Sequence, residues 1–338
     1  NGRVSTRMVV NKRTGKNPVR IIPEAASEEF LIRTLVGPDS VAADICSSKL
    51  SLDDVQLADM EKNGRKLTFH YKTFRFEGVD WQINMVFTLE KGKHYMKKYL
   101  EIAVPDSQRS QARIDYIDFE PMKLPEGIAT WTHPEMEKGV VSGYYISLGQ
   151  PVYVQAMFFG LEFPAAETEI TKDNTVRIRY YSGKNFEMLA EEGRLEEGTF
   201  STWKEVIGAT RSTDMDVIQT DFFSYIQDIS VPIDLRIQYN SWYDFMLDIN
   251  ENNILDSFRE VERGLTQNGV RPLDSYVVDD GWNAYGPWQE ENKTGFWSFN
   301  SKFPNELVTP SDLSHRLASD FGLWLGPRGG YNYYIKFA

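Results

Sequence analysis

The chain has little cysteine, little histidine and no long apolar run. Its single cysteine, Cys46, excludes an internal disulfide, and one cysteine does not decide the redox compartment. The four histidines are too scattered to form a sequence-local zinc motif, and no sequence feature predicts a cofactor or a resident metal. No apolar stretch approaches about 18 residues, so the sequence predicts no transmembrane helix.

Positive charge is also in deficit. The chain carries 37 Lys and Arg against 49 Asp and Glu, a formal net charge of −12 at pH 7. This balance disfavours nucleic acid or an anionic membrane as the main partner, and a neutral or sugar-like substrate fits better. With 41% hydrophobic and 25% charged residues, the composition is that of a globular protein and excludes wholesale disorder.

No targeting signal can be read from the sequence. The sequence opens with Asn1-Gly2-Arg3, without Met, and no signal-peptide core follows. We therefore expect the translated start to lie upstream, and the compartment stays open. The length of 338 residues suggests two domains or one large one, each able to bury a core.

The first two-thirds of the chain have the period of β-strands. Apolar residues occupy every second position from Trp81 to Leu89, which is typical of a strand with one solvent-facing side. The same alternation over 67–71 slips in phase at Phe74 and Phe76, which predicts a β-bulge. The turn Glu90–Lys93 follows the run that ends at Leu89, and it predicts a hairpin between that strand and the next.

More strands are expected before residue 230. Apolar runs separated by Gly, Pro, Asp and Asn clusters predict strands over Tyr95–Val104, Ile114–Phe119, Val140–Leu148, Val152–Phe159 and Val176–Tyr181. Many strands without helical periods between them predict an antiparallel sandwich. We place this β-domain at residues 1–230.

The pattern changes after Val231-Pro232. Residues 235–239 form a short apolar run, apolar residues over 254–265 have the spacing of one helix face, and Gly269 stands where a C-terminal cap belongs. Tyr276-Val277-Val278 then predicts a buried strand. A second helix is expected from the N-cap Thr309 to Gly322 with Phe321 on its apolar face, and a third strand at 323–325.

This order of strands and helices predicts parallel pairing, so residues 231–338 begin an α/β domain. A (β/α)8 barrel needs about 250 residues, so we expect a barrel to continue past Ala338. An open doubly wound sheet is smaller, but three strands are few even for that fold. The expected fold class is therefore multidomain, a β-domain followed by an incomplete α/β domain.

The segment Asp279-Asp280-Gly281-Trp282 lies at the carboxyl end of the predicted second strand, where α/β barrels keep their chemistry. A turn can direct both carboxylates to one pocket, where they accept hydrogen bonds from two sugar hydroxyls, while Trp282 offers a flat apolar face to a pyranose. The structural alternative is a surface turn built on ordinary Asp-Gly chemistry. These four residues alone do not decide between the two interpretations.

Three neighbouring features bear on the same pocket. The connection over 283–308 far exceeds the usual length of about two to six residues, and its aromatic side chains either face a sugar or pack on the sandwich domain. Trp242 follows the first strand and either lines the pocket or caps the barrel core. Arg328 follows the third strand and either meets a carboxylate or a substrate oxygen, or is a solvated loop residue.

Three motifs in order resemble a known family. Tyr239–Tyr243, Val277–Trp282, and Phe303–Asn305 leading to Phe321–Leu325 resemble the start of the catalytic barrel of glycoside hydrolase family 36. This family is the α-galactosidase and α-N-acetylgalactosaminidase group. The preceding β-rich region, including 160–164, resembles the N-terminal supersandwich of that family.

The resemblance implies an N-terminal antiparallel β-supersandwich, the beginning of a (β/α)8 TIM barrel, and a retaining exo-glycosidase acting on terminal α-linked galactose-type sugars. Asp279 and Asp280 match the carboxylate pair that, in the family, holds the O4 and O6 hydroxyls of the terminal galactose. Trp242 matches the tryptophan that forms one wall of the sugar subsite. Retaining chemistry uses two carboxyl groups about 5 Å apart. In the family these are aspartates on the fourth and sixth strands, so the resemblance implies no catalytic residue before Ala338.

One departure from the family pattern concerns the glycone. After the third strand the family tends to continue with a Glu-Pro-Glu-type motif, whereas this chain continues with Gly326–Tyr331. We therefore expect a divergent branch and favour an amino-sugar glycone over galactose. The implied partners are oligosaccharides or glycoconjugates with a terminal α-galactose-type sugar, and the resemblance also implies homo-oligomers.

Other functions stay open on the same residues. A galactosyl-transferring enzyme of this fold differs from a hydrolase only in how well it excludes water. A non-catalytic carbohydrate-binding protein would keep Asp279 and Asp280 but lack the later aspartates. A metal-dependent barrel enzyme would use the same pair as oxygen ligands, but few histidines and no further carboxylate at ligand spacing disfavour it.

Overall fold

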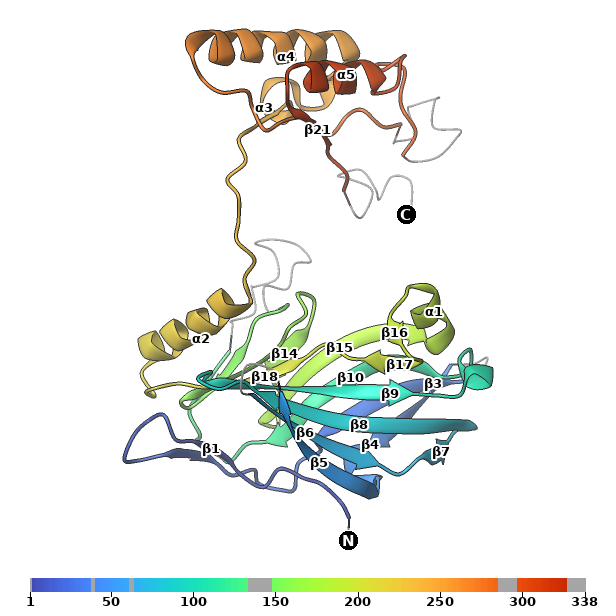
Figure 1. The fold of residues 1–338 in the computed structure, drawn as a ribbon, viewed down its shortest axis with the longest axis vertical. Coiled ribbons are helices and arrows are strands. Elements are labelled where there is room, and N and C mark those ends of the chain that lie inside the picture. The colour runs from blue at the N-terminus through green and yellow to red at the C-terminus, as the bar shows by residue number, and fades with distance from the viewer. Residues whose placement is uncertain (1, 38–39, 61–63, 133–147, 285–296, 327–338) are drawn as a thin grey trace. The chain divides into compact units, whose positions relative to one another are not determined.

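The computed structural model describes residues 2–37, 40–60, 64–132, 148–284 and 297–326. The chain divides into two compact units, Asn1–Ser230 and Val231–Ala338 (Figure 1). The first unit is built from antiparallel sheets and the second contains a parallel sheet with helices. The predicted fold class, a β-sandwich followed by a partial α/β domain, is therefore confirmed.

Two large antiparallel sheets make up the first unit. In spatial order, the five-stranded sheet contains β14 (Glu167–Ile170), β15 (Thr175–Asn185), β10 (Arg113–Lys123), β3 (Phe30–Val36) and β4 (Val41–Cys46). The main path of the second contains β11 (Thr130–Trp131), β12 (Val152–Val154), β13 (Met157–Leu161), β18 (Glu205–Ala209), β9 (Tyr95–Ala103), β8 (Val79–Leu89), β6 (Gly64–Tyr71) and β5 (Leu52–Met60).

Shorter elements complete this unit. They are β1 (Val9–Asn11) paired with β2 (Val19–Ile21), β7 (Phe74–Phe76) on β8, β16 (Leu195–Glu196) paired with β17 (Thr199–Ser201), and the helices α1 (Phe186–Glu191) and α2 (Met215–Ile229). Single 3₁₀ turns lie at Ser47–Lys49 and Asp106–Gln108. Among the described residues, no helix of either unit has the length and apolarity needed to cross a membrane.

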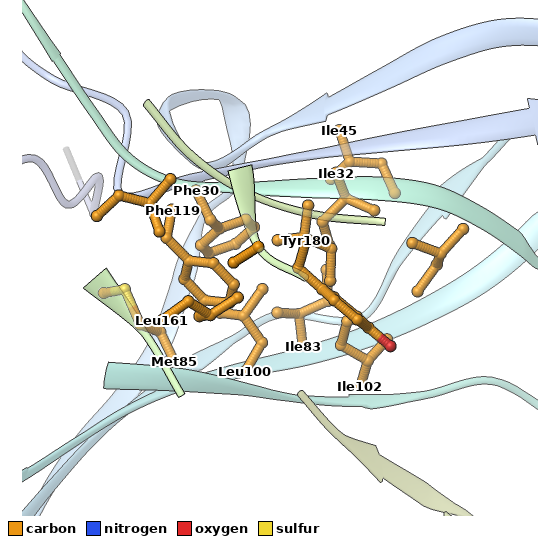
Figure 2. Close-up of a cluster of buried hydrophobic side chains, with 14 of the residues drawn as sticks. Phe30, Ile32, Ile45, Ile83, Met85, Leu100, Ile102, Phe119, Leu161 and Tyr180 are labelled. Atoms are coloured by element: carbon orange, nitrogen blue, oxygen red, sulfur yellow. The ribbon is translucent and has the colours of Figure 1, made fainter. Parts of the chain in front are cut away.

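The core of the first unit lies between the two large sheets. Phe30, Ile32 and Phe119 of the five-stranded sheet meet Ile83 and Leu100 of the larger sheet, all without solvent exposure (Figure 2). Burying each such side chain stabilises the fold by about 1.5–3 kcal/mol. Alternation along the strands places the apolar side chains of each sheet on the face that meets the other sheet, so the two sheets pack as a sandwich.

Two local predictions for this unit are confirmed. β8 and β9 form the antiparallel hairpin expected around the Glu90–Lys93 turn. β6 and β7 pair successively with β8, and between these pairings residues 71–73 oppose only 82–83. The extra residue is the bulge that the slip in the apolar phase predicted.

Two other predictions were wrong. The run Val152–Phe159 is not one strand, because the chain reverses at Gln155, which adopts a φ of 50°, and so forms the β12–β13 hairpin. The region expected to lack helices contains α1 and α2. Helix α2 begins at the N-cap Asp214, whose side chain accepts hydrogen bonds from two backbone N–H groups. The strand expected at Val140–Leu148 lies, up to residue 147, outside the described residues.

The second unit contains three parallel strands in the order β19 (Gln238–Asn240), β20 (Ser275–Val278) and β21 (Asp320–Leu323). Its helices are α3 (Trp242–Phe245), α4 (Glu251–Leu265) and α5 (Val308–Arg316), with 3₁₀ turns at Met246–Asp248 and Thr266–Asn268. Parallel strands linked by helices are what a barrel would begin with. That this unit begins a (β/α)8 barrel stays a prediction.

Helices and strands of the second unit share one apolar cluster. Ile254 and Phe258 of α4 pack with Tyr276 and Val278 of β20 and with Leu313 of α5. The helix spacing predicted for residues 254–265 is thereby confirmed. Gly269 adopts the left-handed conformation of a C-terminal cap, one 3₁₀ turn beyond the end of α4.

The prediction for the second helix of this unit was wrong at both ends. Its N-cap is Leu307 rather than Thr309, and it ends at Arg316 rather than near Gly322. Ala318 takes the left-handed conformation that closes a helix, with a φ of 57°, and Phe321 already belongs to β21. Because alanine rarely adopts this conformation, the sequence did not indicate the stop.

Candidate functional site

The candidate site lies where β19 and β20 end. The two strands are parallel and in register, so the segments that follow Asn240 and Val278 leave the sheet at the same edge. The backbone N–H of Ser241 donates to the carbonyl of Val277 at 3.2 Å, which extends the pairing past the end of β19. Polar side chains that follow these strands are therefore brought together.

The Asp279 carboxylate is buried, at 7% exposure, but it is held by hydrogen bonds. Asn240 Nδ2 donates to Asp279 Oδ2 at 2.7 Å, and the backbone N–H of Asp280 donates to Asp279 Oδ1 at 2.7 Å. The Asp279 backbone N–H donates to Ser241 Oγ at 2.9 Å. A buried carboxylate without such donors would be strongly destabilising. Since a carboxylate has about four acceptor positions, Asp279 keeps capacity for two further donors.

Asp280 is fully buried and starts a tight turn. Its Oδ1 accepts from the backbone N–H of Gly281 at 2.8 Å. Gly281 has a φ of 108°, and a Cβ there would lie 2.8 Å from the carbonyl oxygen of Leu247. Only glycine therefore fits at this position, because the loop after β19 presses directly against the turn after β20.

Trp282 lies inside the apolar cluster of the second unit, at 3% exposure. Its Nε1 donates to the carbonyl of Trp324 at 3.0 Å, and its ring stacks on Trp297 with centroids 5.8 Å apart. The ring of Phe299 also packs on Trp282, with centroids 5.5 Å apart, and Phe303 is buried in the same cluster. These aromatics therefore support the turn from within their own unit, and a contact of Trp282 with sugar stays a prediction.

The other predicted residues are placed as follows. Trp242 is half-buried at the start of α3, and its backbone N–H donates to Asn240 Oδ1 at 2.8 Å. Asn240 thus links Trp242 to Asp279. Arg328, like the loop aromatics at 285, 288 and 296, lies outside the described residues.

Asn240 and Asn300 are site residues that sequence reasoning missed. Asn300 is buried, and its Nδ2 donates to the carbonyls of Gly281 at 2.8 Å and Asn283 at 3.2 Å. Its own backbone N–H donates to the carbonyl of Trp282 at 3.1 Å. Asn300 therefore holds the turn after β20 by both its backbone and its side chain. Asn240 stood within a recognised motif, whereas no sequence pattern pointed to Asn300.

The arrangement offers acceptor oxygens at one edge of the parallel sheet. Within the described ranges, no group of three or more His, Cys, Asp or Glu side chains is placed to hold a metal ion. Asp279 and Asp280 are adjacent carboxylates at one edge of a sheet. The Asn240 amide donates to the Asp279 carboxylate, and the Ser241 hydroxyl accepts from the Asp279 backbone N–H. Such a pair suits a neutral ligand that carries several hydroxyl donors.

Comparison with known proteins found likeness only at the level of solved structures. No protein-family model matches the chain, and no curated protein matches it. A variant of the family 36 α-galactosidase AgaA from Geobacillus stearothermophilus, solved with raffinose, is 13% identical with a TM-score of 0.48, over 93% of this chain and 48% of that one.

Two further structures resemble the chain. The α-galactosidase from Lactobacillus brevis is 14% identical, with a TM-score of 0.47, over 90% of this chain and 46% of that one. The α-N-acetylgalactosaminidase NagBb from Bifidobacterium bifidum is 10% identical, with a TM-score of 0.42, over 95% of this chain and 58% of that one. The chain spans about half the length of these enzymes, and at such identities the likeness concerns the fold alone.

Proposed function

We propose that the chain supplies the sugar-binding part of a retaining exo-glycosidase that acts on terminal α-linked galactose-type sugars. Asp279 and Asp280 would accept hydrogen bonds from hydroxyls of the terminal sugar, and Trp242 would form one wall of the subsite. The nucleophile and the acid/base would be aspartates that follow Ala338. The substrate would be an oligosaccharide or glycoconjugate with galactose, N-acetylgalactosamine or galactosamine at its end.

The observation that carries this proposal is the Asp279 carboxylate. It is buried, it is fixed by Asn240 and by the backbone of Asp280, and it retains acceptor capacity. It stands at the carboxyl end of the central strand of a parallel sheet, where α/β proteins bind their ligands. The order of the three sequence motifs supports a galactose-type ligand over other polyols.

The first test is Asp279→Asn in the protein that carries this chain. The change removes the negative charge and replaces an acceptor oxygen by a donor, so we expect galactose-type ligands to bind more weakly. A lost charge-assisted hydrogen bond is worth roughly 1.5–3 kcal/mol, or about 10- to 100-fold in affinity. Calorimetry with galactose, N-acetylgalactosamine and glucose measures the effect, and glucose is expected to bind weakly to both proteins.

Asp320→Asn is the matched control. Asp320 undergoes the same chemical change at the start of β21, at the opposite end of the strands, where it is exposed and pairs with Arg236. We expect this variant to bind sugar like the unaltered protein. Equal affinity of the Asp279→Asn variant and the unaltered protein would remove Asp279 from the sugar site.

Activity itself is tested with aryl α-galactosides and α-N-acetylgalactosaminides. Release of sugar with retained anomeric configuration supports a retaining hydrolase. Products in which the sugar has moved to another saccharide indicate a transferring enzyme instead. Sugar binding without turnover by the natural polypeptide would identify a carbohydrate-binding protein.

A further inference from the structure

The first unit contains a pocket of about 480 Å³ that the proposed function does not use. It is lined by residues of β9, of the loop that joins β17 to β18, of the segments after β13 and before β16, and of the end of α2. All of them belong to the unit Asn1–Ser230, so the pocket shares no residue with the candidate sugar site. Small-molecule sites typically have volumes of about 300–1,000 Å³, so this pocket has the size to hold a small ligand.

One wall of the pocket is the loop between β17 and β18, whose backbone is fixed. The N–H of Thr202 donates to the carbonyl of Leu100 at 2.9 Å, and the Thr202 hydroxyl accepts from the N–H of Leu100 at 3.0 Å. The carbonyl of Lys204 accepts from the N–H of Glu162 at 2.9 Å. Because this wall is formed in advance, a ligand does not have to order it on binding.

Trp203 gives this wall an aromatic surface. Its ring stacks on that of Phe163, with centroids 5.2 Å apart and 29° between the ring planes. Trp203 is only half-buried, and Ser201 in the same lining is exposed. The Ser201 hydroxyl makes no hydrogen bond with any described residue. An indole surface next to a free hydroxyl suits a ligand that has both an apolar ring face and hydroxyl groups, as a pyranose does.

Two cations of the pocket lie on aromatic rings rather than on carboxylates. Arg194 Cζ lies 5.2 Å from the ring centroid of Trp203, and Lys204 Nζ lies 5.6 Å from that of Tyr99. Within the described residues, neither cation forms an ion pair. The face of a ring attracts a cation without using up its N–H hydrogen bonds, so these donors remain available to an anion.

The carboxylate of the pocket is already neutralised. Glu162 Oε1 lies 2.7 Å from Lys97 Nζ and accepts from the Tyr225 hydroxyl at 3.1 Å. Among the described lining residues, the charges of Arg194 and Lys204 are therefore left uncompensated, on a chain whose net charge is −12. Such a local surplus of positive charge attracts an anionic ligand.

We propose that this pocket is a second saccharide site of the protein, and that it binds an acidic sugar. Arg194 and Lys204 would donate to the carboxylate or sulfate group of a pyranose, while the sugar ring packs on the open surface of Trp203 and a sugar hydroxyl meets Ser201. The anionic character of the ligand follows from the two cations. The choice of a sugar over other anions rests on the proposed function, because the substrate of an exo-glycosidase is itself a saccharide.

Calorimetry with the whole protein tests the site with three sugars that lack the galactose configuration. Glucuronic acid and glucose 6-sulfate carry the two acidic groups, and glucose is their neutral counterpart. We expect the better of the two acids to bind at least tenfold more tightly than glucose, since a charge-assisted hydrogen bond contributes about 10- to 100-fold in affinity. The better acid also shows whether the site takes a carboxylate or a sulfate.

Two outcomes of this measurement would overturn the proposal. Glucose that binds as tightly as both acids would mean that the cations take no part. Acetate or inorganic sulfate that binds as tightly as the acidic sugars would mean that the pocket holds an anion without recognising a sugar.

Arg194→Gln and Lys204→Gln each remove one of the two cations. Both residues are exposed, so we expect folded proteins whose affinity for the better acid falls by about tenfold. Arg20→Gln is the matched control, because Arg20 is exposed on β2, does not line the pocket and forms no ion pair within the described residues. It should leave the affinity unchanged. Equal losses in all three variants would mean that only the net charge matters, and the site would be wrong.

Asp279→Asn separates this inference from the proposed function. The change lies in the second unit, so the affinity for the better acid should stay that of the unaltered protein. If no galactose-type sugar binds, while the acid binds and Arg194→Gln weakens it, the proposed function fails and the acidic-sugar site stands. If the acid does not bind the unaltered protein, or if Asp279→Asn weakens its binding and Arg194→Gln does not, the inference fails and the proposed function is unaffected.

Discussion

At the scale of single residues, the first unit buries a charged cluster around Lys98. This lysine is fully buried, and its Nζ donates to Glu29 Oε2 at 3.0 Å and to Glu120 Oε2 at 2.5 Å. Glu205 Oε2 lies 3.9 Å from the same nitrogen, and neither Glu205 oxygen has a hydrogen-bond partner within the described part of the chain. Three buried carboxyl groups thus share one ammonium.

The consequence is a carboxyl group that resists ionisation. Burial raises the pKa of Glu205 well above its ordinary value of 4.5, and the attraction of Lys98 only partly opposes this. Burial also raises the pKa of Glu120. When the pKa of a carboxyl group is higher in the folded than in the unfolded state, its contribution to stability is fully present at pH values below the unfolded-state pKa. This contribution is lost as the pH rises through the folded-state pKa. The cluster therefore lowers the free energy of unfolding of the first unit as the pH rises to neutral and alkaline values.

Glu205→Gln tests this coupling. The amide stays neutral, so we expect a higher free energy of unfolding at pH 8 and a flatter pH dependence above pH 5, where one proton contributes up to about 1.4 kcal/mol per pH unit. Urea unfolding across this pH range measures both. Glu196→Gln on the surface should leave the pH dependence unchanged. A Glu205→Gln variant with the slope of the unaltered protein would contradict the assignment.

At the scale of elements, the contact between the two loops of the site depends on Gly281. Substitution to Ala would add a Cβ 2.8 Å from the Leu247 carbonyl and would keep a φ of 108° that side chains disfavour. Strain of this kind costs about 1–3 kcal/mol. We expect Gly281→Ala to lower the stability of the second unit by that amount and to weaken ligand binding.

Gly264 provides the matched control for this substitution. It lies within α4 with an ordinary helical backbone, and a Cβ added there would point into open space, with no neighbouring atom within 4 Å beyond its own helix. Gly264→Ala should stabilise the helix by about 0.5–1 kcal/mol. Thermal unfolding of the two variants should therefore shift in opposite directions, and a shift of both in the same direction would contradict the account.

Elements could be predicted from the sequence where one face is buried and the turns use ordinary residues. The alternation from Trp81 to Leu89 and the phase slip before Phe74 indicated strands and a bulge because burial of one face imposes a two-residue period. The β12–β13 hairpin was missed since Gln155 stands where glycine or asparagine is usual. Helix α2 was predictable, because Asp214 caps it and its buried residues have helical spacing.

The site could be predicted only in part. The position of Asp279 and Asp280 at the end of a parallel strand followed from the chain order, because parallel strands end at one edge. Asn300 and Lys302 act across a loop, on the backbone of Gly281 and Leu247, and no periodicity encodes such contacts. Both side chains donate to backbone carbonyl oxygens, which every residue has, so the identities of the partner residues give no signal in the sequence.

At the scale of the whole molecule, each unit has its own core. Ile117 is fully buried in the apolar cluster of the first unit and Ile254 in that of the second. The segment that joins the units, residues 231–237, contains neither helix nor strand. We therefore predict that residues 1–230 form one domain, that residues 231–338 belong to another, and that the two unfold in separate transitions.

Two matched substitutions test this prediction. Ile117→Val and Ile254→Val each remove one buried methyl group, which costs about 0.5–1.5 kcal/mol. Ile117→Val should lower the transition of the first unit and Ile254→Val that of the second, each by about 2–4 °C per kcal/mol lost and each leaving the other unmoved. Calorimetry measures the transitions, and hydrogen exchange with mass spectrometry assigns them to a unit. A single transition that both variants lower would mean that the chain folds as one cooperative body, and its division into two domains would then be wrong.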